Sequence, residues 1–166
     1  MPGTLVVGLG NPLMGDDGIG LAALTALQDT WSFDPAPTFL DGGTWGMNLL
    51  PDIEDADRAL LLDAVACGRP PGTLVALVRE ELPRFFAVKL SPHQVDLREV
   101  LAVAELRGTL PADTMVMGLQ PARVALTTEL SEPVRLAVPA LVDLAARQLE
   151  AWHHLARRRE PATCTS

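Results

Sequence analysis

Two adjacent carboxylates, Asp16 and Asp17, stand in a glycine-rich segment near the start of the chain, GLGNPLMGDDGIG. A glycine-rich loop behind an apolar strand commonly cradles a phosphate, but this segment fits neither of two phosphate-binding patterns. The third glycine of GxGxxG falls on Leu13, and the two acids occupy the positions that a P-loop gives to its lysine and hydroxyl residue. Because two carboxylates repel an anion, the pair is better suited to a cation, or to capping the helix that follows.

A third acid, Asp63, directly follows the apolar run Leu60–Leu62. A carboxylate at the end of a buried strand is unfavourable unless it is paired or bound to a cation, although a cap or turn role is the alternative. Asp41 also follows a short apolar segment, but Gly42 and Gly43 come directly after it and favour a role in a turn. Asp63 is therefore the second candidate ligand.

The third candidate is His93, because we expect the only other histidines, His153 and His154, to be solvated near the C-terminus. His93 stands in the first turn of a predicted helix, where the helix dipole favours the neutral imidazole that can act as a ligand or base. Two carboxylates and one imidazole suit a divalent first-row metal ion and leave coordination positions open. Asp17, Asp63 and His93 thus indicate a metal-assisted hydrolase or a metal-binding protein, without selecting the metal.

Short apolar runs alternate with amphipathic stretches along the chain, which predicts alternating strands and helices. This order is typical of a three-layer α/β/α sandwich around a mainly parallel, about five-stranded sheet. Ligands of such sheets bind beyond the carboxyl ends of the strands, where Asp17 and Asp63 are expected. The predicted strands cover residues 4–7, 38–40, 58–65, 73–79 and 115–119, and the predicted helices cover 18–27, 45–53, 91–106 and 132–155.

The 166 residues are expected to form a single domain, 1–166, with a flexible tail from about residue 157. A formal net charge of -8 opposes binding to nucleic acid, and the basic cluster Arg157–Arg159 is interpreted as part of that solvated tail. No apolar run is long enough to cross a bilayer, and we expect no signal peptide. With two cysteines, Cys67 and Cys164, we expect a reduced, cytoplasmic, monomeric protein without disulfides.

Four longer motifs resemble those of one known family, in the same order. They are GLGNPLMGDDGIG, LDGGTWGMNLLPDIEDADRALLLDAV, FFAVKLSPHQVDLREVLAVAELRG and GLQPARVALTTELS. On these motifs the sequence resembles the hydrogenase maturation proteases, endopeptidases that trim the C-terminus of the large subunit of nickel–iron hydrogenases. The segments DGGTWGMNLLP and KLSPHQVDL are most similar to those of the branch that serves membrane-bound uptake hydrogenases.

The resemblance implies an α/β/α sandwich and three metal ligands, which fall on Asp17, Asp63 and His93 at the matching positions. The first ligand of the family is commonly glutamate, one methylene longer than aspartate, so either Asp16 or Asp17 could reach the metal. The resemblance also implies that the nickel ion is carried by the substrate, the large-subunit precursor, and that the resting protease need hold no metal.

Two other functions are compatible with the sequence. Cys67, with His93 as its base, could be the nucleophile of a cysteine hydrolase, although a small apolar filler role is the alternative for this residue. A nickel chaperone or scaffold that binds the precursor without cutting it would use the same ligands. In the protease interpretation, Trp45, Met47 and Leu49 are expected to form an apolar rim that docks the precursor, with core packing as the alternative.

Overall fold

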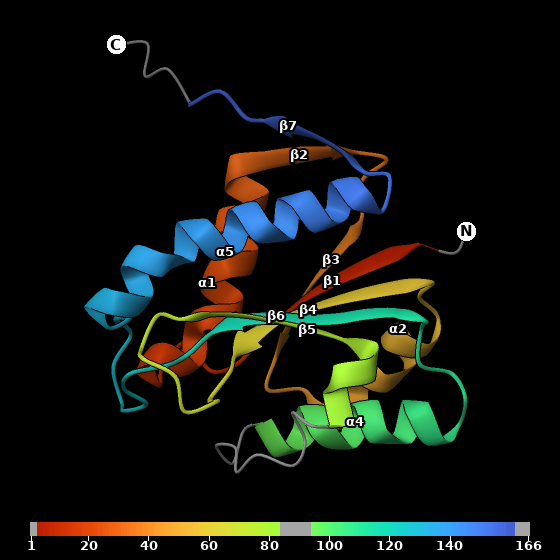
Figure 1. The fold of residues 1–166 in the computed structure, drawn as a ribbon, viewed down its shortest axis with the longest axis horizontal. Coiled ribbons are helices and arrows are strands. Elements are labelled where there is room, and N and C mark those ends of the chain that lie inside the picture. The colour runs from red at the N-terminus through yellow and green to blue at the C-terminus, as the bar shows by residue number, and fades with distance from the viewer. Residues whose placement is uncertain (1–2, 84–93, 162–166) are drawn as a thin grey trace.

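Five strands form the central sheet: β1 (Thr4–Leu9), β3 (Thr38–Gly43), β4 (Arg58–Ala64), β5 (Leu74–Val78) and β6 (Asp113–Leu119). The computed structural model describes residues 3–83 and 94–161, apart from the side chains of residues 94–96. The strand order is β3-β1-β4-β6-β5 (Figure 1). Strands β3, β1, β4 and β6 are parallel, and β5 pairs with β6 in the antiparallel direction.

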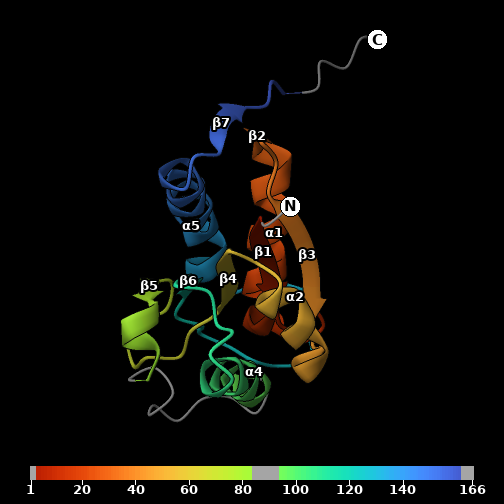
Figure 2. The same ribbon diagram turned by 90° about the vertical axis from the view of Figure 1, so that its right-hand side faces the viewer.

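Helices cover both faces of this sheet (Figures 1 and 2). One face carries α1 (Ile19–Thr30) and α5 (Glu132–Ala151), and the other carries α2 (Leu50–Glu54) and α4 (Gln94–Leu106). Because β1 and β4 are covered on both sides, they are apolar at consecutive positions rather than at alternate ones. The described residues also form three short 3-10 turns: η1 (Gly15–Gly18), η2 (Gly46–Leu49) and η3 (Arg79–Glu81).

The sandwich predicted from the sequence is confirmed, as is its mainly parallel sheet of five strands. Two buried clusters make its core, one between the sheet and helices α1 and α5, the other between the sheet and helices α2 and α4. In the described part of the chain, no helix has the length and apolar character needed to cross a membrane.

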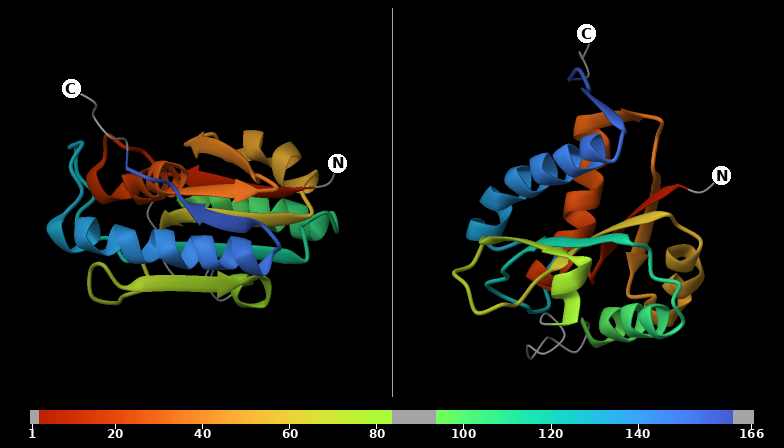
Figure 3. Two further views of the ribbon diagram at one scale, coloured as in Figure 1. Left: turned by 90° about the horizontal axis from the view of Figure 1, so that it is seen from above. Right: turned by 45° about the vertical axis from the view of Figure 1, so that its right-hand side comes forward.

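The C-terminal region differs from the prediction. The last helix was expected to reach Leu155 but ends at Ala151, and His153 turns the chain with a left-handed φ of 71°. The following residues form a short strand, β7 (Leu155–Arg158), which pairs antiparallel with β2 (Trp31–Asp34). Figure 3 shows this two-stranded sheet beside the adjacent ends of α1 and α5.

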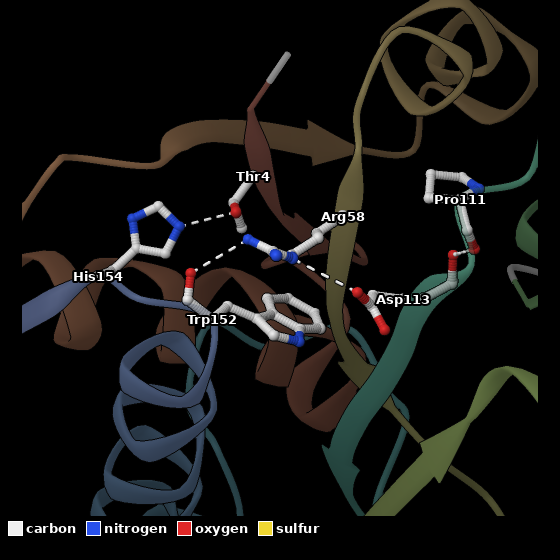
Figure 4. Close-up of polar contacts among 7 residues, drawn as sticks. Thr4, Arg58, Pro111, Asp113, Trp152 and His154 are labelled. Carbon is white, nitrogen blue, oxygen red and sulfur yellow. Dashed lines mark hydrogen bonds and ion pairs between the residues drawn. The ribbon is translucent and has the colours of Figure 1, made fainter.

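The expectation that both C-terminal histidines are solvated is wrong for His154, which is buried. Its Nε2 lies 2.7 Å from the hydroxyl oxygen of Thr4 (Figure 4). Its Nδ1 lies 2.6 Å from the carbonyl oxygen of Pro35. Because a carbonyl oxygen only accepts, Nδ1 must carry a proton. His154 therefore links the segment after α5 to the start of β1.

The arginine cluster also differs from a purely solvated tail. Arg157 and Arg158 belong to β7, and the Arg158 guanidinium lies 5.9 Å from the centre of the Trp31 ring. The Nε–H of Arg159 donates to the carbonyl oxygens of Gln28 and Trp31, at 2.8 and 3.1 Å. Residues 155–159 are thus attached to the end of α1 and to β2.

Candidate functional site

A small cavity lies at the carboxyl edge of the sheet, where β1, β3 and β4 end together. Its volume is about 20 Å³, which is room for a single ion or water molecule. Two carboxylates line it, Asp17 from η1 and Asp63 from β4. The other lining residues are Leu9, Gly10, Gly43, Thr44, Gly46, Leu49 and Leu97.

Asp63 is buried because it belongs to a strand that is covered on both faces. Its Oδ1 accepts a hydrogen bond of 2.8 Å from the backbone N–H of Ala64. Burial raises the pKa of Asp63 to about 8; the Ala64 hydrogen bond opposes this rise, and the nearby charge of Asp17 adds to it. At neutral pH this carboxyl group therefore favours either a proton or a cation in the cavity.

Asp17 reaches the same cavity from the loop after β1. It is buried, and its Oδ2 accepts a hydrogen bond of 3.0 Å from the backbone N–H of Asn11. The loop can close over the strand end only with glycine at position 10, where φ is +115°. A Cβ on Gly10 would overlap the carbonyl oxygen of Asp17 and would lie 3.8 Å from Oδ1 of Asp63. Gly10 thus allows both acidic residues to approach one point.

Asp16 is also buried but does not line the cavity. Its carboxylate accepts four hydrogen bonds from residues 122–131. Burial alone would raise the pKa of Asp16, but the hydrogen bonds from Arg123, Ser131 and Ala122 outweigh it and hold the pKa below its usual value. The alternative that these acids cap a helix is wrong, since neither η1 nor α1 has a side-chain cap.

The remaining predicted residues fall into different places. His93 lies outside the described residues, and within the described residues no group of three or more His, Cys, Asp or Glu side chains could hold a metal ion. Asp41 is exposed on β3 and does not line the cavity. Cys67 packs at the margin of the core, and its backbone N–H donates to Oε1 of Gln120 at 2.7 Å.

Two of the three residues predicted to form an apolar rim on the surface are exposed. Trp45 and Met47 are exposed, at 54% and 44%, but Leu49 is buried at 1%. Leu49 was wrongly placed on the surface, because η2 turns it into the core on the α2 and α4 face, where it also lines the cavity.

The sequence analysis missed several residues that shape the cavity, among them Thr44 and Leu97. Thr44 follows β3 at the same edge of the sheet, and the rule that placed Asp63 there applies equally to it. Leu97 is in α4, and no local sequence signal connects it to the cavity. Such a contact depends on how the helix docks.

Known proteins resemble this chain over most of its length. A model of the hydrogenase maturation protease family matches residues 22–148. The hydrogenase expression/formation protein HupD of Thiocapsa roseopersicina is 36% identical over 167 residues, which covers 99% of this chain and 76% of that protein. The hydrogenase 2 maturation protease of Escherichia coli K12 is 37% identical over 118 residues, which covers 70% of this chain and 72% of that protein. Among solved structures, the hydrogenase maturating endopeptidase HybD from E. coli superposes with a TM-score of 0.88 at 31% identity, covering 96% of this chain and 98% of that one.

Proposed function

This chain belongs to the hydrogenase maturation protease family and is a peptide hydrolase, and we propose that it removes the C-terminal extension of a nickel-loaded hydrogenase large-subunit precursor. In this proposal the nickel ion arrives with the substrate. Asp17 and Asp63 bind it from the protease side, and His93 is the third ligand.

One observation supports this proposal above the others: two buried carboxylates share a cavity the size of one ion. A buried, charged Asp63 is unfavourable without a cation, as its raised pKa indicates: burial is the main cause, and the nearby charge of Asp17 adds to it. A divalent ion presented to the cavity would favour the charged form of Asp63 and so release its proton. Carboxylate oxygens and an imidazole nitrogen suit a divalent first-row ion such as nickel.

The proposal also accounts for selectivity. A precursor without nickel would lack the contact that distinguishes it from the loaded precursor, so it would not dock productively. A cavity of about 20 Å³ suits an ion better than a side chain, which supports the proposal that the ion is the part of the substrate that enters it.

The test is cleavage of a nickel-loaded precursor, followed by mass spectrometry. We expect the wild-type chain to shorten the precursor, and Asp17→Asn, Asp63→Asn and His93→Ala each to abolish most of this processing. Double variants should be little worse than single ones, because two remaining ligands cannot position a shared ion. Asp113→Asn removes an exposed carboxylate that pairs with Arg58 at 3.4 Å, and it should process normally.

Wild-type rates from both Asp63→Asn and His93→Ala would contradict the proposal. Binding of the precursor without shortening would identify a chaperone or scaffold instead. Two results together would favour a cysteine hydrolase: iodoacetamide inactivates the wild-type chain, and Cys67→Ser has low activity that iodoacetamide does not reduce further.

A further inference from the structure

Asp16 is a buried acid that the proposed chemistry does not use. Its Oδ2 accepts hydrogen bonds from the N–H groups of Ala122 and Arg123, at 2.8 and 2.9 Å, and from the Ser131 hydroxyl at 2.7 Å. Its Oδ1 accepts a further bond from the N–H of Ser131 at 2.7 Å. A carboxylate has about four acceptor sites, so these four bonds satisfy Asp16 without a cation.

The backbone around Asp16 is joined to the same segment, residues 122–131. The N–H of Gly15 donates to the carbonyl of Thr127 at 2.8 Å, and the N–H of Thr127 donates to the carbonyl of Leu13 at 3.0 Å. The N–H of Asp16 donates to the carbonyl of Arg123, also at 3.0 Å. Side-chain and backbone bonds therefore hold the 122–131 segment against the turn that carries both acids.

Asp17 is held much less directly. Among the described residues, its carboxylate accepts one hydrogen bond, from the N–H of Asn11. Successive side chains of a 3-10 turn point about 120° apart, so the direction of Asp16 determines that of its neighbour. With Asp16 directed into the 122–131 segment, Asp17 is directed to the cavity that it shares with Asp63.

We propose that Asp16 is a positioning residue: its four hydrogen bonds to the 122–131 segment orient η1 so that Asp17 faces Asp63 across the cavity. The proposal rests on the proposed function, because it takes Asp17 to bind the ion carried by the substrate. The two adjacent acids then have different tasks: Asp17 binds the ion, and Asp16 orients Asp17.

Substitutions can separate this task from simple stabilisation. Asparagine has the shape of aspartate but presents an amide N–H₂ group to N–H donors. Asp16→Asn should therefore lose some of the four hydrogen bonds and change the orientation of η1. Ser131→Ala removes only the hydroxyl donor and should have a smaller effect. The control is Thr4→Val, which removes the hydroxyl partner of buried His154 at the opposite edge of the sheet. It should lower thermal stability and leave the cavity with Asp17 and Asp63 unchanged.

The experiment measures kcat and KM for the nickel-loaded precursor, and the dissociation constant of the free chain for nickel chloride, below the melting temperature of every variant. We expect Asp16→Asn to lose about tenfold or more in kcat and in nickel affinity, as residues that orient metal ligands do. Ser131→Ala should lose less, and the Asp16→Asn/Ser131→Ala double variant should be no worse than Asp16→Asn. Thr4→Val should keep wild-type kcat and nickel affinity.

Wild-type kcat and nickel affinity in Asp16→Asn would overturn this inference while leaving the proposed function intact. Losses in Thr4→Val as large as those in Asp16→Asn would also overturn it, because stability alone would then explain the effect. If Asp16→Asn does not fold, the graded loss in Ser131→Ala decides, and an unchanged Ser131→Ala overturns the inference. A wild-type chain that does not cut the precursor would reject the proposed function and this inference together.

Discussion

Asp16 and Asp17 are neighbours in the sequence, yet their carboxylates face different surroundings. Asp17 lines the cavity with Asp63, whereas Asp16 bonds to residues that lie 106 to 115 positions further along the chain. The sequence predicted that an acid of this pair and Asp63 meet at one edge of the sheet, because strand ends share an edge. It could not divide the pair, because the partners of Asp16 are distant in sequence.

The raised pKa of Asp63 makes the stability of the protein depend on pH. Between the ordinary unfolded pKa of about 3.9 and the folded value of about 8, the folded chain holds a proton that the unfolded chain lacks. The stabilising contribution is therefore fully present below about pH 4 and is lost as the pH rises through about 8. Asp63→Asn cannot ionise, so its stability relative to wild type should increase by a few kcal/mol between about pH 5.5 and about pH 8.5.

Urea unfolding at several pH values measures this difference. The exposed carboxylate variant Asp113→Asn is the control and should follow the pH dependence of the wild type. A stability difference between Asp63→Asn and wild type that stays constant across this range would show that Asp63 has an ordinary pKa.

At the scale of elements, the strands with clear apolar runs were predictable and the two short ones were not. Strands β1 and β4 lie in the middle of the sheet, where both faces are covered, and their sequences show it. Strands β2 and β7 have four residues each and are partly or fully exposed, so they carry no such pattern. Helix α5 was predicted too long because helix-forming residues continue beyond its end; the chain leaves the helix where His154 becomes buried.

This account of α5 predicts the effect of removing the buried imidazole. His154→Ala leaves the Thr4 hydroxyl and the Pro35 carbonyl without their partner, and the free energy of unfolding should fall by about 1–3 kcal/mol. Cleavage of the precursor at saturating enzyme should not change, because this contact lies at the amino end of β1. His153→Asn is the control, since asparagine tolerates the left-handed conformation of this exposed position.

Chemical denaturation and the cleavage assay together test this prediction. An unchanged unfolding midpoint in His154→Ala would mean that β7 and the preceding turn contribute little to the fold. A lost cleavage activity with unchanged stability would mean that the two edges of the sheet are coupled.

On the scale of the whole molecule, the two edges of the sheet differ in kind. At the amino edge, polar contacts join the C-terminal segment to the strands: besides His154, the guanidinium of Arg58 donates to the carbonyl of Trp152 at 3.1 Å (Figure 4). At the carboxyl edge, the loops carry the cavity and several exposed apolar side chains, among them Leu13, Trp45 and Leu126. The alternating pattern of the sequence predicted a site at the carboxyl edge, because loops at carboxyl ends hold the sites of such sheets. It did not predict the contacts at the amino edge, where His154 was expected to be solvated.

A cavity of about 20 Å³ offers a protein substrate little surface to contact. The remaining contacts must then lie on the surrounding loops, where exposed apolar side chains commonly mark binding surfaces. Trp45 is 54% exposed and follows Thr44, which lines the cavity. If the proposed function is correct, Trp45 is therefore the residue of the predicted rim best placed to contact the precursor.

We predict that Trp45→Ala raises KM for the nickel-loaded precursor by about five- to tenfold, as for an exposed aromatic anchor at an interface, with little change in kcat. The melting temperature should shift by less than about 2 °C, because a half-exposed side chain contributes little to the core. Leu155→Ala, at 52% exposure on β7 at the other end of the molecule, is the matched control and should leave KM unchanged. Steady-state cleavage and thermal unfolding of the same samples decide whether Trp45 docks the precursor or packs the loop. A large fall in melting temperature with an unchanged KM would place Trp45 in the packing of the loop.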